Sequence, residues 1–254
     1  MAYTLSNKSI LQCDDLKISL HGTEIEKVTE FKFLGIHLDD HLSWKPHMNK
    51  LLSKIHRNLG VVRKISCFLN KSTLIQLYHS MIMSHIRYGI TVWHHGQIAL
   101  RKKIQACTNK FLRMVYFMKK RESVKSLMKE NEMMSVNQIF HLEISKIMQR
   151  VTLSDIPTPF IDIFKNQSRT TTMITRCSSN FFQTYTSFQK CKPSISYTGP
   201  CAWNSIPIEI KGIDILNNPA SDTYKNHSKV NSKPFLLQFK NKIKKFVLSD
   251  ISFI

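Results

Sequence analysis

Two adjacent carboxylates, Asp39 and Asp40, invite comparison with the paired aspartates of polymerases. Such pairs hold metal ions against a phosphate, but the metal cage needs a third carboxylate from another strand. A short acidic side chain also suits the turn before a helix, because its oxygen accepts free backbone N–H groups. We therefore assign the pair to a turn, expect Asp40 or Ser43 to cap the following helix, and predict no catalytic residue.

Histidine and cysteine are numerous enough to raise the question of a metal site. The chain has 11 histidines and six cysteines, yet Cys177, Cys191 and Cys201 lie 14 and 10 positions apart, and no CxxC pair occurs. Zinc sites usually contain such close ligand pairs. No GxSxG motif frames a nucleophilic serine. We predict no bound metal, no cofactor, and core positions for the three tryptophans, Trp44, Trp93 and Trp203.

Positive charge is the strongest global feature of the chain. Lys and Arg number 37 and Asp and Glu number 17, which gives a formal net charge of +20. A chain with this charge repels itself unless a polyanion compensates it. Nucleic acid is the usual polyanion, with an anionic membrane surface as the second possibility. A basic protein without such a partner is the remaining alternative.

The N-terminal residues MAYTLSNKSI contain no basic segment followed by an apolar run, as a secretion signal would. No apolar stretch approaches the length that spans a bilayer. We expect a protein that is not secreted, has no transmembrane segment, keeps its thiols reduced and works in the nucleus or cytoplasm.

The periodicity of apolar residues predicts a mainly α-helical fold with a small antiparallel β element at the N-terminus, an α+β class. Residues 16–38 alternate as strands, with FKFLGIHL as one strand whose aliphatic face is buried and whose Gly35 marks a bulge or a close backbone approach. Asn70 or Ser72 could cap the second helix. Helical spacing predicts helices at about 45–64, 72–88, 97–118, 136–151 and 234–248.

The first of these helices is amphipathic. Its apolar residues cluster on one side, and four basic residues fall on the opposite side: Lys50, Lys54, Arg57 and Lys64. Lys110 and Arg113 add basic residues to a later helix. We predict that these six residues bind nucleic acid, while a merely solvated helix face is the alternative.

Three sets of segments carry a family resemblance. VTEFKFLGIHLDDHLSWKPHM stands at 28–48; LYHSMIMSHIRYGITVW at 77–93 precedes KIQACTNKFLRMV at 103–115; TRCSSNFF at 175–182 precedes SYTGPCAWNSIPIEIK at 196–211 and FLLQFKNKIKKFV at 235–247. In order and spacing, over about residues 15–250, they resemble the C-terminal part of reverse transcriptases from non-LTR retrotransposons, of the LINE type and jockey-like.

The resemblance implies roles for individual segments. The strand with Phe33, Leu34 and Gly35 corresponds to the primer grip, and the helices after it correspond to the thumb, which holds the template–primer duplex. The implied organisation is a residual palm and primer-grip element at 1–40, a helical thumb-like domain at 41–151, and a less regular C-terminal extension at 152–254 that ends in a basic helix. The family's catalytic carboxylates lie in the palm, upstream of the primer grip, where this sequence has only about thirty residues.

We therefore expect a non-catalytic fragment that binds RNA, DNA or their hybrid with little regard to sequence. Without a palm beside it, the β element could also mediate self-association. The alternatives are a piece of a longer active reverse transcriptase polyprotein, a structural or interaction module recruited from a transposon, and a decayed reading frame.

Overall fold

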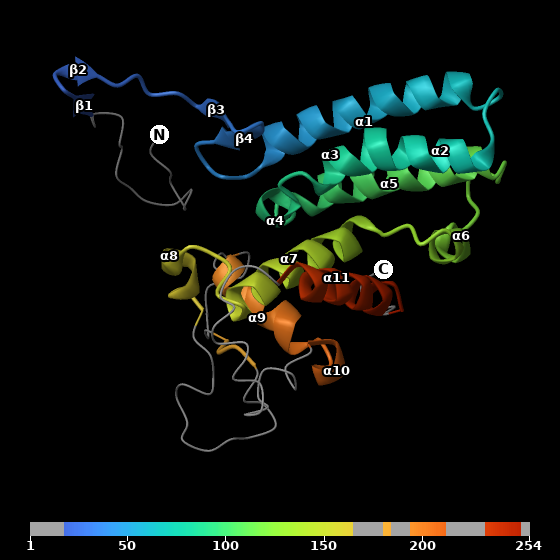
Figure 1. The fold of residues 1–254 in the computed structure, drawn as a ribbon. Helices are drawn as coiled ribbons and strands as arrows, with labels where there is room; N and C mark the ends of the chain where they lie inside the picture. Colours follow the sequence, from blue (N-terminus) through green and yellow to red (C-terminus); the bar gives the residue numbers. More distant parts are fainter. Residues whose placement is uncertain (1–17, 165–179, 184–193, 212–231, 250–254) are drawn as a thin grey trace. The chain divides into compact units, whose positions relative to one another are not determined.

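The computed structural model describes residues 18–164, 180–183, 194–211 and 232–249. It is mainly helical, with small antiparallel hairpins near the N-terminus, which confirms the predicted α+β class (Figure 1). The chain forms two compact units, Met1–Val124 (unit 1) and Lys125–Ile254 (unit 2). The boundary after Val124 lies inside the thumb-like range 41–151 that the resemblance implies, and that three-part organisation stays a prediction.

Unit 1 begins with two separate two-stranded hairpins: β1 (Ser19–Leu20) with β2 (Thr23–Glu24), and β3 (Glu30–Phe33) with β4 (Ile36–Asp39). FKFLGIHL is therefore not one strand, and Gly35 is not a bulge. Leu34 and Gly35 have φ of 46° and 82° and form a two-residue hairpin turn, for which glycine suits the second position. The predicted burial of the aliphatic face was also wrong at the turn, because Leu34 is 74% exposed.

The rest of unit 1 is a helical bundle built from α1 (Lys45–Ile65), α2 (Lys71–Tyr78), the π-helical turn η2 (His79–Met83), α3 (Ser84–Arg87), α4 (Ile90–Trp93) and α5 (Ile98–Val115). The predicted helices at 45–64 and 97–118 are confirmed within a few residues. Helix α1 packs on α5, and the α2–η2–α3 segment packs against both (Figure 1). Asn70 caps α2, because its side chain accepts a 2.8 Å hydrogen bond from the backbone N–H of Thr73.

The core of the bundle is formed by the apolar faces of these helices. Tyr78 and Phe111 are fully buried, and their rings stack with centroids 4.8 Å apart. Ile55 of α1 and Ile104 of α5 are also fully buried. Removing such apolar side chains from water is the main favourable contribution to folding.

The hairpin β3–β4 is attached to the bundle at Gly89. The predicted helix at 72–88 ends there, because Gly89 adopts the left-handed conformation with φ of 61°. A Cβ atom at this position would lie 2.6 Å from Cδ1 of Ile36 in β4. Trp93 of α4 is fully buried and donates from Nε1 to the carbonyl oxygen of Tyr88 at 3.0 Å, which confirms its predicted core position.

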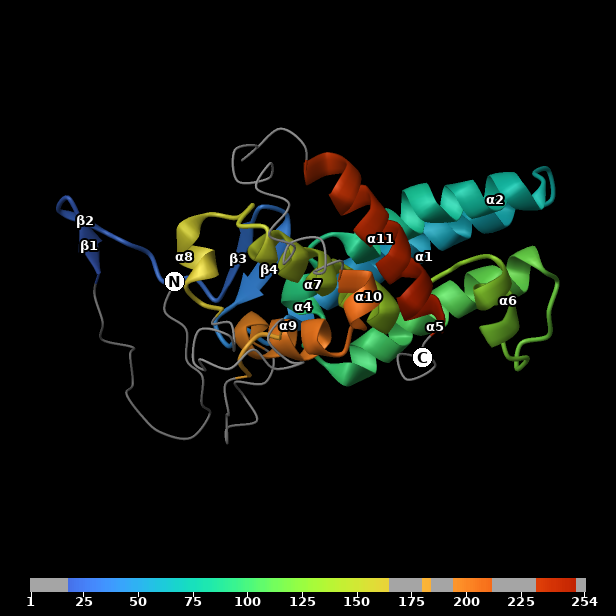
Figure 2. The same cartoon turned by 60° about the horizontal axis from the view of Figure 1, so that its bottom comes forward.

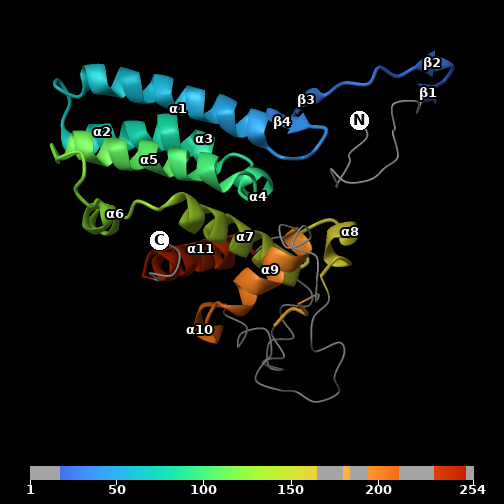
Figure 3. The same cartoon turned by 180° about the vertical axis from the view of Figure 1, so that it is seen from behind.

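Unit 2 contains α6 (Lys125–Glu130), α7 (Val136–Thr152), α8 (Thr158–Ile161), α9 (Ile195–Asn204), α10 (Ile208–Lys211) and α11 (Ser232–Ser249). The predicted helices at 136–151 and 234–248 correspond to α7 and α11. Helices α9 and α11 both pack on α7 (Figures 2 and 3). Trp203 of α9, 1% exposed, stacks on Phe239 of α11 with ring centroids 5.8 Å apart, so its core position was also predicted correctly.

A capping box fixes the start of α7. The Ser135 hydroxyl accepts from the backbone N–H of Gln138 at 3.3 Å, and the Gln138 side chain accepts from the backbone N–H of Ser135 at 2.9 Å. Gln138 also donates to the carbonyl oxygen of Val247 in α11 at 2.9 Å. Within the ranges that the structure describes, no helix is both long enough and apolar enough to cross a membrane.

Two glycines in unit 1 offer a matched test of this packing. Replacing Gly89 with Ala should lower the free energy of unfolding by about 1–3 kcal/mol, because φ is positive and the new methyl group meets Ile36. Replacing Gly60, inside α1 with open space around it, should raise it by about 0.5–1 kcal/mol. Urea unfolding of both variants measures this. Equal effects of the two substitutions would contradict both the left-handed backbone and the close contact with Ile36 at Gly89.

Candidate nucleic-acid interface

Helix α1 has one buried and one charged face. Six of its residues are buried: His47, Met48, Leu51, Ile55, Leu59 and Val62. The five apolar ones recur at the helical spacing that the sequence predicts, whereas burial of His47 was not predicted. The four predicted basic residues, Lys50, Lys54, Arg57 and Lys64, are all exposed. At 1.5 Å per residue they extend over about 21 Å of helix. An apolar side thus anchors the helix while the other side presents a row of cations to solvent.

No Asp or Glu occurs between Asp40 and Glu122. We call this stretch the acid-free segment; it contains all of α1 to α5. Its sixteen Lys and Arg residues are Lys45, Lys50, Lys54, Arg57, Arg63, Lys64, Lys71, Arg87, Arg101, Lys102, Lys103, Lys110, Arg113, Lys119, Lys120 and Arg121. The bundle of unit 1 therefore cannot neutralise its own positive charge with carboxylates from the same helices.

Lys50 differs from the other three basic residues of α1. Its Nζ forms an ion pair with Glu30 of β3 and lies 3.0 Å from Nδ1 of His37 in β4. The hydrogen bond from Lys50 is the main cause that lowers the pKa of the exposed Glu30 carboxyl. Lys54, Arg57 and Lys64 form no ion pair within the described residues. The side chains available to phosphates without breaking an ion pair are therefore these last three.

His47 lies beneath this ion pair. Its side chain is buried, and Nδ1 faces the backbone N–H of His37 at 3.4 Å. Burial, followed by the charges of His37 and Lys50, lowers the pKa of His47 to about 4. His47 is therefore neutral at neutral pH and adds no charge to the surface.

Asp39 occupies the junction between β4 and α1. Its Oδ2 accepts from the backbone N–H of Ser43 and its Oδ1 from that of Trp44, both at 3.0 Å. Burial opposes ionisation of Asp39, but the hydrogen bonds from Ser43 and Trp44 outweigh it and lower the pKa. Trp44, without a side-chain capping bond, is the N-cap residue of α1, so neither Asp40 nor Ser43 takes that position. Ser43 does help at this end, because its hydroxyl accepts from the backbone N–H of Lys45 at 3.4 Å, and both Asp39 oxygens hold the turn before the helix.

The primer-grip-like residues Phe33, Leu34 and Gly35 form the tip of the β3–β4 hairpin. Phe33 and Leu34 are 56% and 74% exposed. The Tyr88 hydroxyl donates to the carbonyl oxygen of Leu34, and the same ring lies 3.5 Å from where a Gly35 Cβ would stand. The close approach at Gly35 is thus made by a side chain, not a backbone. The expected self-association through this element stays a prediction.

Lys110 and Arg113 occupy different environments on α5. Lys110 is exposed, whereas Arg113 is half-buried. The Arg113 guanidinium donates from Nε and Nη2 to the carbonyl oxygen of Glu122, at 3.0 and 2.9 Å. Arg113 therefore holds the loop after α5 in place, a role that the sequence did not suggest, while Lys110 is available to a ligand.

Within the described ranges, no three His, Cys, Asp or Glu side chains lie close enough together to hold a metal ion. Cys177 and Cys191 lie outside the described residues. Cys107 of α5 lies with its Sγ 3.2 Å from Nε2 of His56 in α1, and burial raises the pKa of its thiol. This pair joins the two helices.

Sequence reasoning missed two exposed aromatic residues, Phe68 and Phe117. They lie in the turns after α1 and α5 and are 87% and 90% exposed. The signal was present, because neither residue continues the apolar periodicity of the helix before it. The acid-free segment was equally visible in the sequence.

Comparison with known proteins gives one partial similarity. Over 79 residues, the chain is 32% identical to the retrovirus-related Pol polyprotein from type-1 retrotransposable element R1 of Bradysia coprophila. The match covers 30% of this chain and 8% of that polyprotein. No family model matches the chain, and no solved structure matches it. The similarity supports a retrotransposon-related origin.

The Asp39 junction should contribute to stability independently of any ligand. Replacing Asp39 with Ala leaves two backbone N–H groups without their acceptor and should lower the free energy of unfolding by about 1–3 kcal/mol. Asp40, whose side chain is 41% exposed, is the matched control, and its replacement with Ala should change stability by no more than about 0.5 kcal/mol. Urea unfolding that gives the larger loss for Asp40 would refute this assignment.

Proposed function

We propose that this chain binds nucleic acid with little sequence preference through the exposed face of α1, as the thumb-like part of a protein related to retrotransposon reverse transcriptases. The observation that carries the proposal is the acid-free segment. Its helices bury their apolar faces and expose Lys54, Arg57 and Lys64 without an ion pair within the described residues. Lys110 of α5 adds a further exposed cation.

Phosphate binding accounts for such a surface better than base recognition does. Lysine and arginine that contact phosphates release condensed counterions, and this release supplies affinity for any sequence. Base recognition needs side chains placed against base edges in a groove. A row of long, charged side chains on one helix face suits the regularly spaced phosphates of a duplex. RNA, DNA and their hybrid are therefore all candidate ligands.

The partial similarity to the R1 polyprotein supports the proposed relation to retrotransposon proteins. The matched residues make up 8% of that polyprotein. FKFLG resembles a primer grip, and on that resemblance we expect α1 to lie where a template–primer duplex would pass. The ion pair between Glu30 and Lys50 joins β3 to α1, so the hairpin and the first turns of the helix can present one continuous surface.

We further propose that this chain alone does not polymerise DNA. Asp39 is engaged by two backbone N–H groups, which leaves it poorly suited to hold a metal ion. Primer extension with a template, nucleotides and magnesium should give no product. Extension that persists after Asp39 and Asp40 are replaced with Asn would mean that other residues of the chain form an active site.

The binding face can be tested by replacing Lys54, Arg57 and Lys64 together with Ala. Alanine preserves helices, so the helical content should stay close to that of the parent. The slope of log K against log salt should become shallower by about 0.9 for each lost contact on B-form DNA, and affinity for unrelated sequences should fall equally. Titration of a fluorescent duplex between about 50 mM and about 200 mM salt measures both quantities.

The matched control replaces Lys240, Lys242 and Lys245, three exposed lysines of α11 in unit 2. It removes the same charge from a helix of similar length, so net charge alone predicts equal effects of the two triple variants. If α1 is the binding face, the control variant should show nearly the affinity and salt dependence of the parent. If the control weakens binding and the α1 variant does not, the binding face lies on α11 instead.

A further inference from the structure

Two phenylalanines are exposed at one end of the unit 1 bundle. Phe68 lies in the turn between α1 and α2, and Phe117 follows α5; they are 87% and 90% exposed. By contrast, Phe111, two turns earlier in α5, is fully buried. Single exposed apolar residues are common, but two almost fully exposed aromatic rings at the same end of a bundle are a candidate contact surface for a ligand.

The two turns belong to the same end because of how the helices pack. Helix α2 starts directly after the Phe68 turn and packs on α5. Lys71, in the first turn of α2, places its Nζ over the ring of Tyr116 at 5.0 Å from the centroid. Tyr116 is the residue before Phe117. In Figure 1, the connection from α1 to α2 and the last turn of α5 lie at the same end of the bundle.

The backbone at Phe117 is unusual for a residue of this type. Phe117 has a φ of 52°, in the left-handed region. The backbone N–H of Met118 donates to the carbonyl oxygen of Arg113 at 2.9 Å, so α5 ends in the motif that places glycine at the position of Phe117. A side chain other than glycine is strained there. Backbone strain at a residue is a reason to ask whether that residue has a function.

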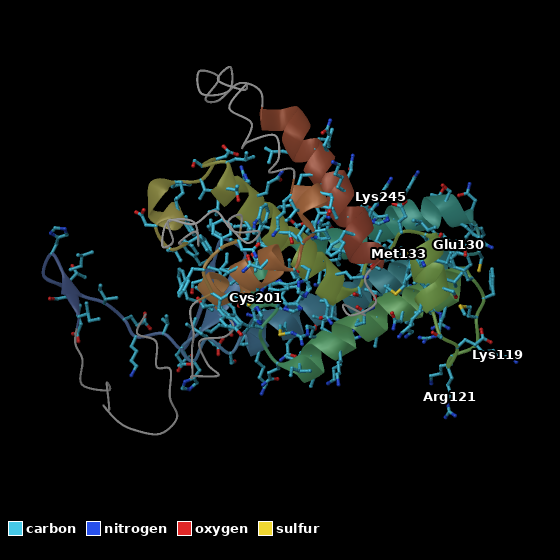
Figure 4. All side chains as sticks on the ribbon, turned by 90° about the horizontal axis from the view of Figure 1, so that it is seen from below. Lys119, Arg121, Glu130, Met133, Cys201 and Lys245 are labelled. Atoms are coloured by element: carbon cyan, nitrogen blue, oxygen red, sulfur yellow. The ribbon has the colours of Figure 1, made fainter. Side chains whose placement is uncertain are left out.

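Basic residues flank both phenylalanines in the sequence. Arg63 and Lys64 end α1 beside Phe68, and the run Lys119, Lys120 and Arg121 directly follows the Phe117 turn. Lys119 and Arg121 extend outward from the loop after α5 (Figure 4). Neither turn contains a carboxylate, because both turns lie within the acid-free segment. This end of the bundle therefore combines exposed aromatic rings with lysine and arginine side chains.

We infer that this end of unit 1 binds unpaired nucleotides, with bases stacked on Phe68 and Phe117 and phosphates held by the neighbouring lysines and arginines. Every base has a flat face, so such stacking needs no particular sequence. The inference rests on the proposed function, since Lys64 belongs both to this end and to the basic face of α1. A duplex on α1 would thus continue into a single strand at the two rings.

Nucleic acid fits this end better than a membrane surface does. Helices that lie in a membrane interface present a continuous apolar face. Here two separate rings project from different turns, with cations between them in the sequence. Binding to anionic vesicles is therefore the competing outcome that the experiment has to include.

The test uses the full chain with Phe68 replaced by Ala and Phe117 by Gly. Glycine suits the backbone at 117, so this change should raise the melting temperature, and a loss of binding cannot then be attributed to misfolding. The probes are a blunt hybrid duplex and the same duplex with an unpaired overhang that carries 2-aminopurine. The variant should bind the overhang probe about 10-fold to 100-fold more weakly than the parent, and the blunt duplex equally well.

The parent should change the 2-aminopurine fluorescence through stacking, and the variant should not. A second variant, with Tyr at both positions, keeps the rings and should retain the overhang affinity. Equal overhang binding by the parent and the Ala/Gly variant would overturn the inference while leaving the proposed function in place. If the parent binds neither probe, the proposed function itself fails. If the Ala/Gly variant binds both nucleic-acid probes as the parent does but no longer binds anionic phosphatidylserine vesicles, the rings belong to a membrane-binding surface and the inference is wrong.

Discussion

Uncompensated positive charge is the constraint on which the organisation of unit 1 depends. Between Asp40 and Glu122 the chain builds five α-helices and a π-helical turn without a carboxylate. Like charges at close range oppose compaction, so the cations have to lie on the surface and the apolar faces have to supply the stability. The buried row of α1 and the stacked pair of Tyr78 and Phe111 do this. What remains outside is a surface that a polyanion can neutralise.

Two acidic residues that precede this segment have structural roles. Glu30 draws Lys50 toward β3, and Asp39 ties the end of β4 to the turn before α1. Gly89 lets Ile36 of the same hairpin approach the bundle. These contacts position the hairpin against the first turns of α1 and leave Lys54, Arg57 and Lys64 exposed. Unit 2 differs, because some of its lysines pair with carboxylates of the same unit: Lys146 with Glu143 inside α7, and Lys244 of α11 with Glu132 in the turn after α6.

The helices with strong apolar periodicity could be predicted from the sequence, and so could the basic face of α1, because both depend on local spacing. The turn at Leu34 and Gly35 could not, since FKFLGIHL alternates through it like a single strand. Helix α9 was missed because it contains Gly199 and Pro200, which normally argue against a helix. Gly199 lies where a Cβ would stand 2.6 Å from Sδ of Met148, so packing on α7 favours glycine there. The loop-holding role of Arg113 depends on a tertiary contact that no periodicity reveals.

Lysine reactivity tests the central claim most directly. Mass spectrometry can follow acetylation of each lysine in the full chain, with and without a hybrid duplex. The account predicts that the duplex protects Lys54, Lys64 and Lys110 of unit 1, while Lys240 and Lys242, exposed on α11, react as before. Protection of Lys240 and Lys242 with unchanged reactivity at Lys54 and Lys64 would contradict it.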